Sequence, residues 1–307
     1  MKTRLILLLT TITLLFIIVG CSSDNKSGTD STSKNLDNNQ DLEENDEGND
    51  IITEKDLLES LLEEANKYTH VMLKDESFSI GIDKFGNYEL RQHNDNIQDL
   101  RLSETKVEIE FVQNEEDYEL SNGMKGIIGD TGGGYISFVH YDNDMRTVID
   151  LGEIQIEDAK KKLDSLEFRN EDITENEIKE LLGFDYEDAK FFDNKETDYD
   201  VSELWINTGD YKKFEVRYRN PDAGEFDAID IRINVEEFEV DDYVEPENIT
   251  TNKGKKVEII DDGFYAHWLW EEDDYFYQIA GNYSEEEVEK KEYNLEVIDK
   301  MTKKYGE

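Results

Sequence analysis

The most informative part of the sequence is FYAHWLW (264–270), the acidic turn EEDD (271–274), YFYQIAG (275–281) and SEEEVEKKEYNLEVIDKM (284–301). Alternating apolar residues on both sides of a short polar turn predict two antiparallel strands, and the acid-led segment after them predicts a helix that reaches Met301. The same order occurs about 130 residues earlier, as YISFVHY, DND, MRTVIDLG and IEDAKKKLDSL (135–166). The chain is therefore expected to be a tandem duplication.

The rest of the chain fits this two-copy plan. Each copy is expected to open with a capped helix, at Thr53 and at Thr174, because acids follow each threonine within the first helical turn. The strand segments that follow correspond in pairs: 88–91 with 214–217, and the alternating 106–112 with 228–235. Alternation without long crossovers favours antiparallel sheets with helices packed on one face. We therefore predict an α+β fold of two tandem repeats, residues 52–168 and 171–304.

The N-terminus predicts export and a lipid anchor. Lys2 and Arg4 precede an apolar run from 5 to 19 that is too short for a stable spanning helix, which is typical of a signal peptide. Its end, Val19-Gly20-Cys21, resembles the lipobox of bacterial lipoproteins. The resemblance implies that residues 1–20 are removed and that Cys21 carries a diacylglyceryl anchor. The expected location is the extracytoplasmic face of a Gram-positive cell membrane.

Composition restricts the classes of partner. Residues 21–51 are mostly Ser, Asn, Asp, Glu and Gly, so we expect a disordered acidic tether. Loss of the signal peptide removes two basic residues and no acid, which takes the net charge from −44 to −46. Such a charge repels nucleic acid and anionic head groups, so neither is an expected partner of the folded part. The charge is expected to serve solubility, and attraction of cations or of cationic envelope partners is the alternative.

A second resemblance concerns the C-terminal repeat. The W-x-W strand, the acidic turn, Tyr275-Phe276-Tyr277 and the helix start from Gly281 to Glu286 are similar to the C-terminal portion of a domain of unknown function. That domain is common in Gram-positive lipoproteins and membrane-anchored regulators. The similarity covers about 60 residues. It implies an extracytoplasmic compartment and this fold, and it implies no catalytic residue.

One motif suggests an envelope hydrolase of the aspartic type. Asp130-Thr131-Gly132 repeats the Asp-Thr-Gly of aspartic proteases, and Asp261 stands at nearly the corresponding place in the second copy. Gly129 precedes the first motif, where an apolar residue is required, and the second copy has no Thr or Ser after Asp261. Both stretches are better explained as turns, in which Asp and Gly are common.

Metal-binding patterns are equally incomplete. Asp142, Asp144, Asp150 and Glu153 have the outer spacing of a calcium loop, but Arg146 falls at a ligand position. The four histidines have none of the spacings of zinc motifs, and they are His70, His93, His140 and His267. A metal-dependent hydrolase or a low-affinity cation-binding protein therefore stays an alternative, and no cofactor or metal is expected.

The aromatic hairpin is the remaining candidate surface. Trp268 and Trp270 share one face of their strand, opposite His267, and Tyr275 and Tyr277 share a face of the next strand. This face is either core or a groove for a peptide or glycan of the cell envelope. The corresponding residues of the first copy are less aromatic: Phe138, Tyr141, Met145 and Thr147. We therefore expect a non-catalytic binding or accessory protein whose binding surface lies in the second repeat.

Overall fold

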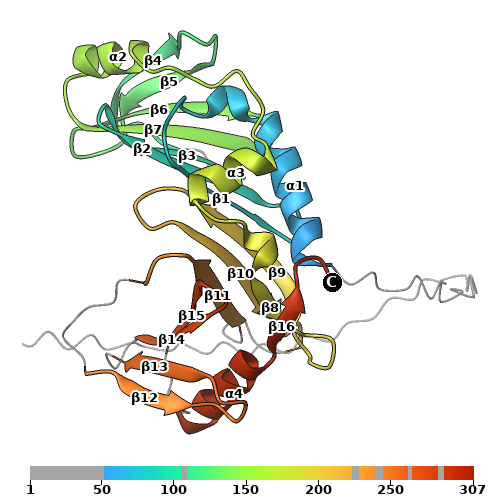
Figure 1. Ribbon diagram of the computed structural model, residues 1–307. Coiled ribbons are helices and arrows are strands. Elements are labelled where there is room, and N and C mark those ends of the chain that lie inside the picture. Colours follow the sequence, from blue (N-terminus) through green and yellow to red (C-terminus); the bar gives the residue numbers. More distant parts are fainter. Residues whose placement is uncertain (1–51, 105–108, 223–227, 239–244, 262–264, 283–286) are drawn as a thin grey trace, which may run out of the picture. The chain divides into compact units, whose positions relative to one another are not determined.

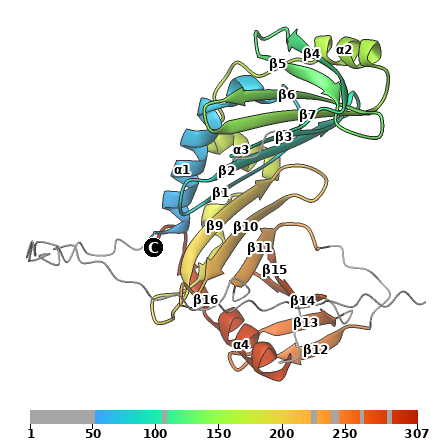
Figure 2. The ribbon, with the colours of Figure 1, turned by 180° about the vertical axis from the view of Figure 1, so that it is seen from behind.

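An antiparallel sheet of fourteen strands dominates the part of the chain that the computed structural model describes, residues 52–104, 109–222, 228–238, 245–261, 265–282 and 287–307 (Figures 1 and 2). These residues belong to one compact unit. Cys21, the predicted tether and the predicted helix start at Ser284 lie outside the described residues. The prediction of an α+β fold built on antiparallel strands is confirmed, although strands outnumber helices.

Along the chain, the strands of the first half of the sheet lie between one long helix and one short helix. Its elements are α1 (Glu54–Lys67), η1 (Thr69–Val71), β1 (Phe78–Asp83), β2 (Tyr88–Asn94), β3 (Ile97–Glu104), β4 (Gln113–Glu119), β5 (Lys125–Asp130), β6 (Tyr135–Asp142), β7 (Met145–Glu153) and α2 (Ile156–Asp164). The predicted hairpin around 84–87 is β1–β2, and its turn contains Gly86 with a φ of 87°.

The second half repeats this layout with an added strand pair. Its elements are α3 (Glu175–Leu182), η2 (Tyr186–Asp188), β8 (Lys190–Phe192), β9 (Asp200–Asn207), β10 (Lys213–Arg219), β11 (Ala228–Asn234), β12 (Glu247–Thr250), β13 (Lys256–Asp261), β14 (Tyr265–Glu272), β15 (Tyr275–Asn282), α4 (Glu287–Asp299) and β16 (Met301–Lys304). Strands β8 and β16 pair with each other outside the large sheet.

The strand order is the same in both halves. The sheet runs β12-β13-β14-β15-β11-β10-β9-β1-β2-β3-β7-β6-β5-β4, with β1 and β9 paired at its centre. Outward from this pair, each half places its first, second, third, seventh, sixth, fifth and fourth strands in turn. Each predicted aromatic hairpin, β6–β7 and β14–β15, turns at a residue with a φ of 53°, Asn143 and Asp273.

The helix starts follow the predicted capping. Thr53 accepts a hydrogen bond from the Asp56 backbone, and the Asp56 side chain accepts one from Thr53 in return. Thr174 caps α3 through the backbone N–H of Glu177. Helix α1 buries its leucine stripe and packs against β1, β2 and β9. The central pair of strands is therefore covered on this face by α1.

Two predicted boundaries are wrong. The predicted strand 106–112 overlaps residues outside the described part, and 109–112 is not a strand. Phe111 in this segment packs its ring against Gly129 of β5. The strands there are β3 and β4. The last helix ends at Asp299, and Met301 opens β16, because pairing with β8 buries Met301 completely.

Candidate functional site

The four aromatic residues predicted as a binding surface lie in the core. Trp268, Trp270, Tyr275 and Tyr277 are between 1 % and 9 % exposed. The Trp270 ring stacks on that of Tyr277, with centroids 5.1 Å apart. The structure thus brings the four residues together, but as packing inside the protein and not as an exposed groove.

These aromatics anchor the segment between α3 and β9. The Tyr277 hydroxyl accepts a hydrogen bond from the Lys190 backbone N–H at 2.9 Å, and the Tyr275 hydroxyl donates to the Asp185 carbonyl at 2.7 Å. Phe184 packs edge-on against Tyr275. Burial raises the pKa of Tyr277 to about 12. The additional aromatics of the second half therefore have a structural role, since the described residues of the first half contain no counterpart of β8 to anchor.

The strand order and registers correct two sequence correspondences. Strand β11 corresponds to β3 (Ile97–Glu104) and not to the predicted 106–112. In the second half, Ile233, Tyr277 and Trp270 form one cross-strand row. In the first half, Leu102, Thr147 and His140 form the row on the corresponding strands. His140 is therefore the counterpart of Trp270, whereas Tyr141 points to the other face of the sheet. The other predicted counterparts of the aromatics, Phe138, Met145 and Thr147, fit the register.

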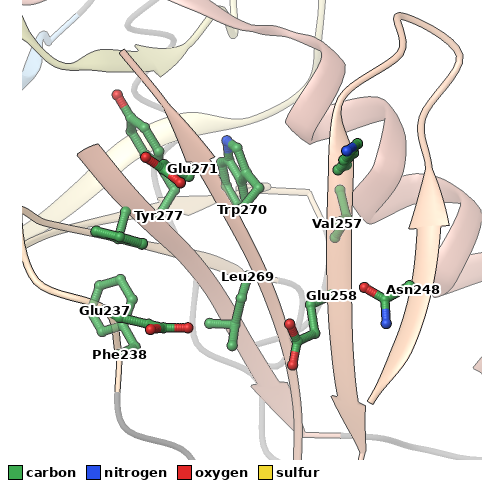
Figure 3. A pocket seen from close by; sticks show the side chains of 11 residues that line it. Glu237, Phe238, Asn248, Val257, Glu258, Leu269, Trp270, Glu271 and Tyr277 are labelled. Atoms are coloured by element: carbon green, nitrogen blue, oxygen red, sulfur yellow. The ribbon is translucent and has the colours of Figure 1, made fainter. Parts of the chain in front are cut away.

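A pocket of about 200 Å³ lies along β12–β15, and two of the four predicted aromatics, Trp270 and Tyr277, are among its lining residues; we call it the β12–β15 pocket (Figure 3). Figure 3 shows Leu269 and Glu258, which are directly opposite in the register, with Glu237 and Phe238 from the segment after β11 beside them. Phe276 and Glu271 form the next cross-strand pair. The remaining residues along the pocket are Asn248, Lys256, Val257, Trp270 and Tyr277.

The β12–β15 pocket combines apolar contacts with negative charge. Leu269, Phe276 and Phe238 are partly exposed side chains that a ligand could cover. Three glutamates, Glu237, Glu258 and Glu271, line the same pocket, together with one lysine, Lys256. Such a surface favours a ligand with a cationic group and an apolar group. The sequence-based prediction included two of its lining residues, Trp270 and Tyr277, but not the more exposed Leu269 and Phe276, which alternation places on the opposite face of their strands.

The first half has a pocket at the corresponding place. It measures about 600 Å³ and lies on the outer face of β4, β5 and β6. The row Asp117–Ile127–Val139 there corresponds to the row Asn248–Glu258–Leu269 of the β12–β15 pocket. The two pockets differ in chemistry, because Ile127 stands where the second half has Glu258.

The aspartates of the hydrolase hypothesis are not brought together. Asp130 ends β5 and Asp261 ends β13, and these strands are each second from opposite edges of the sheet. Asp130 accepts hydrogen bonds from Gln113 Nε2 at 3.0 Å and from the Gly132 N–H at 2.7 Å, and these bonds hold the pKa of its carboxyl below the usual value. Asp130 therefore shapes a turn, and it forms no catalytic pair with Asp261.

The cation-binding candidates are also separated. Asp142 and Asp144 lie at the exposed tip of the β6–β7 hairpin. Within the described residues there is no group of three or more His, Cys, Asp or Glu side chains arranged to hold a metal ion. His140 and His267 lie on opposite faces of their strands, as alternation predicts.

No protein-family model, curated protein or solved structure matches this chain. Across the residues that the structure covers, no helix combines the length and the apolar character needed to cross a bilayer.

Proposed function

We propose that this protein is an extracytoplasmic lipoprotein, anchored through Cys21, that binds a partner in the cell envelope and catalyses no reaction. The lipobox resemblance supports the anchor, and the acidic segment 21–51 would act as the spacer between lipid and fold. The main observation in support of a binding role is the β12–β15 pocket, whose side chains can recognise a ligand by shape and charge. Its lining residues carry three carboxylates, one amide, one lysine, the Tyr277 hydroxyl and the Trp270 indole, and the Tyr277 hydroxyl is hydrogen-bonded to the Lys190 backbone.

The partner's chemistry follows from the pocket. Carboxylates around Leu269 and Phe238 complement a segment that carries Lys or Arg beside an apolar side chain. The net charge of −46 that remains after loss of residues 1–20 would also speed the approach of such a cationic partner at low salt. We infer a basic peptide segment of an envelope protein as the ligand class.

We also propose that the fold is a tandem duplication, residues 52–168 and 171–304, with helices on one face of each half of the sheet. The identical strand order of the halves supports it, as do the corresponding pocket rows. A repeated motif supports it too: Asp99-Leu100-Arg101-Leu102 on β3 and Asp230-Ile231-Arg232-Ile233 on β11. The face opposite α1 carries the pockets, which fits function on one face and packing on the other.

The binding role is tested with labelled peptides. A Lys-Leu-Lys-Phe peptide should bind the purified chain, and a Glu-Leu-Glu-Phe peptide of equal length should not, by fluorescence anisotropy. Phe238→Ala and Glu258→Gln should each weaken binding about tenfold, whereas Phe85→Ala removes an exposed phenylalanine outside the pocket and should change nothing. Equal binding of both peptides, or equal loss with Phe85→Ala, would contradict the proposed binding mode.

The anchor is tested separately. Changing Cys21→Ala should move the protein from the membrane fraction to the medium, because no acyl group can then be attached. Cys21→Ala protein that stays in the membrane fraction as wild type does would refute the anchor and leave the peptide result untouched.

A further inference from the structure

The first half contains a polar cavity that the proposed binding role does not use. It measures about 170 Å³ and lies on the outer face of β3 and β7; we call it the β3–β7 cavity. Its volume equals that of about five or six water molecules in the liquid, so it admits only a small ligand. The residues that line it are Asp99, Arg101, Ser103, Ile109, Arg146, Val148 and Asp150.

One end of the β3–β7 cavity is acidic and holds an incompletely bonded carboxylate. Asp99 is 7 % exposed and directly opposite Asp150 in the register. One Asp99 oxygen, Oδ2, pairs with Arg101 Nε. The other, Oδ1, accepts no hydrogen bond from the residues that the structure describes, and His93 Nδ1 is 3.7 Å from it. A buried acceptor without a donor costs free energy, so this end favours a ligand with N–H groups.

The other end of the cavity is basic. Arg146 is directly opposite Ser103, and Arg101 lies between the two ends, opposite Val148. The Arg101 side chain is 61 % exposed, so its guanidinium can accommodate a ligand. Asp99 and Ser103 are four residues apart on the same strand, so the ends are separated by about 13 Å between Cα atoms. The cavity therefore has an acidic end, an apolar wall at Val148 and a basic end.

In the second half, the charged residues of the same motif pair with residues on neighbouring strands. Asp230 accepts two hydrogen bonds from Arg217, at 2.5 and 2.9 Å. Arg232 donates to Glu215 and to Gln278, both at 2.9 Å. Phe276 and Ala280 stand opposite Asn234 and Asp230, where the first half has Arg146 and Asp150. Asp150 and Arg146 of the first half therefore have no charged counterparts at the corresponding positions of the second half.

We propose that the β3–β7 cavity binds a small zwitterion of dipeptide size, with its ammonium group on Asp99 and Asp150 and its carboxylate on Arg146 and Arg101. The free Asp99 oxygen takes an ammonium N–H, and a guanidinium is the preferred partner of a carboxylate. A single amino acid is too short to reach both ends, whereas a dipeptide places one peptide unit beside Val148. This site is independent of the lipid anchor and of the β12–β15 pocket.

The test is calorimetric titration of the purified chain with alanyl-alanine and three analogues. N-acetyl-alanyl-alanine lacks the ammonium, alanyl-alanine amide lacks the carboxylate, and alanine lacks the length. We expect alanyl-alanine to bind at least tenfold more tightly than each analogue. No heat of binding at millimolar dipeptide, or equal affinity for any one analogue, would overturn the proposal.

Variants locate the site. Asp99→Asn and Arg146→Gln should each weaken alanyl-alanine binding at least tenfold, and the milder Ser103→Ala serves if either fails to fold. Arg91→Gln is the matched control, because Arg91 is exposed, stands directly opposite Arg101 on β2 and does not line the cavity. Unchanged affinity in Asp99→Asn, Arg146→Gln and Ser103→Ala, each folded by circular dichroism, would place the dipeptide elsewhere and refute the assignment.

Discussion

A buried ion pair joins the first helix to the last strand, and its disruption should be the costliest single change in the fold. Lys303 Nζ lies 3.0 and 3.1 Å from the two carboxylate oxygens of Glu54, which is fully buried. The Tyr218 hydroxyl donates to the same carboxylate at 2.8 Å. Changing Lys303→Met leaves the Glu54 charge buried with one hydroxyl as partner. Loss of one member of a buried pair costs about 3–5 kcal/mol.

This cost is large enough to measure by thermal and urea unfolding. In a domain of this size, 1 kcal/mol corresponds to about 2–4 °C in Tm, so the Tm should fall by about 6–20 °C. Lys304→Met is the matched control, because Lys304 is the exposed neighbour on β16 and should change stability by less than about 0.5 kcal/mol.

A double variant separates the charge from the packing. Adding Glu54→Gln to Lys303→Met removes the uncompensated charge, while the carbonyl oxygen of the introduced amide can still accept from Tyr218. The double variant should therefore recover about half or more of the free energy of unfolding that Lys303→Met loses. A Lys303→Met loss below about 1 kcal/mol, or a double variant less stable than Lys303→Met alone, would refute the reasoning.

Three further predictions concern stability. Burial raises the pKa of Tyr277 to about 12, so its stabilising contribution should fall by about 1.4 kcal/mol per pH unit between pH 10 and 12, where the unfolded state loses this proton and the folded state keeps it. The pKa values of Tyr88, Tyr186 and Tyr218 are raised too and add to the total slope. In urea titrations across this range, the loss of stability with pH should therefore be about 1.4 kcal/mol per pH unit shallower for Tyr277→Phe than for wild type. Gly81→Ala would put a Cβ within 2.5 Å of the Trp205 ring and should lower the free energy of unfolding by about 1–3 kcal/mol. Urea unfolding of the single and double variants checks this, because adding Trp205→Ala should make Gly81→Ala less costly. Because the Asp130 pKa lies below its ordinary value of 3.8, its contribution is present above pH 3.8 and should fade as the pH falls further; Asp130→Ala should flatten this part of the acid unfolding curve.

Local sequence signals were sufficient for the starts of α1 and α3 and for the tight turns. A threonine cap acts through neighbouring backbone N–H groups, so Thr53 and Thr174 could be identified without tertiary information. Gly86 and Asn143 adopt positive φ, which few other residue types adopt at low cost. Alternation also separated the two faces of β14 correctly.

Which face of β14 is buried could not be read from the sequence. Both faces carry large side chains with apolar surface. The buried face is the one covered by the segment 184–192, about 80 residues away in the sequence, which hydrogen-bonds to Tyr275 and Tyr277. Met301 is similar: its spacing continues the helical pattern of α4, but pairing with Phe192 on β8 places it in a strand. Tertiary contacts of this range override local propensity.

The two copies of the Asp-x-Arg motif show why the candidate sites are harder to predict than the fold. Arg232 finds Glu215 and Gln278 on neighbouring strands, 17 and 46 residues away, and the pKa of Glu215 reflects this: burial opposes ionisation, but Lys213 and Arg232 outweigh it and lower the pKa. Arg101 has the same local sequence and yet faces a cavity. For the fold, each motif only has to form a strand with one buried face. The residues next to its outer face can differ without changing that strand. What the outer face binds is therefore decided by substitutions that leave the strand pattern, and hence the predicted fold, unchanged.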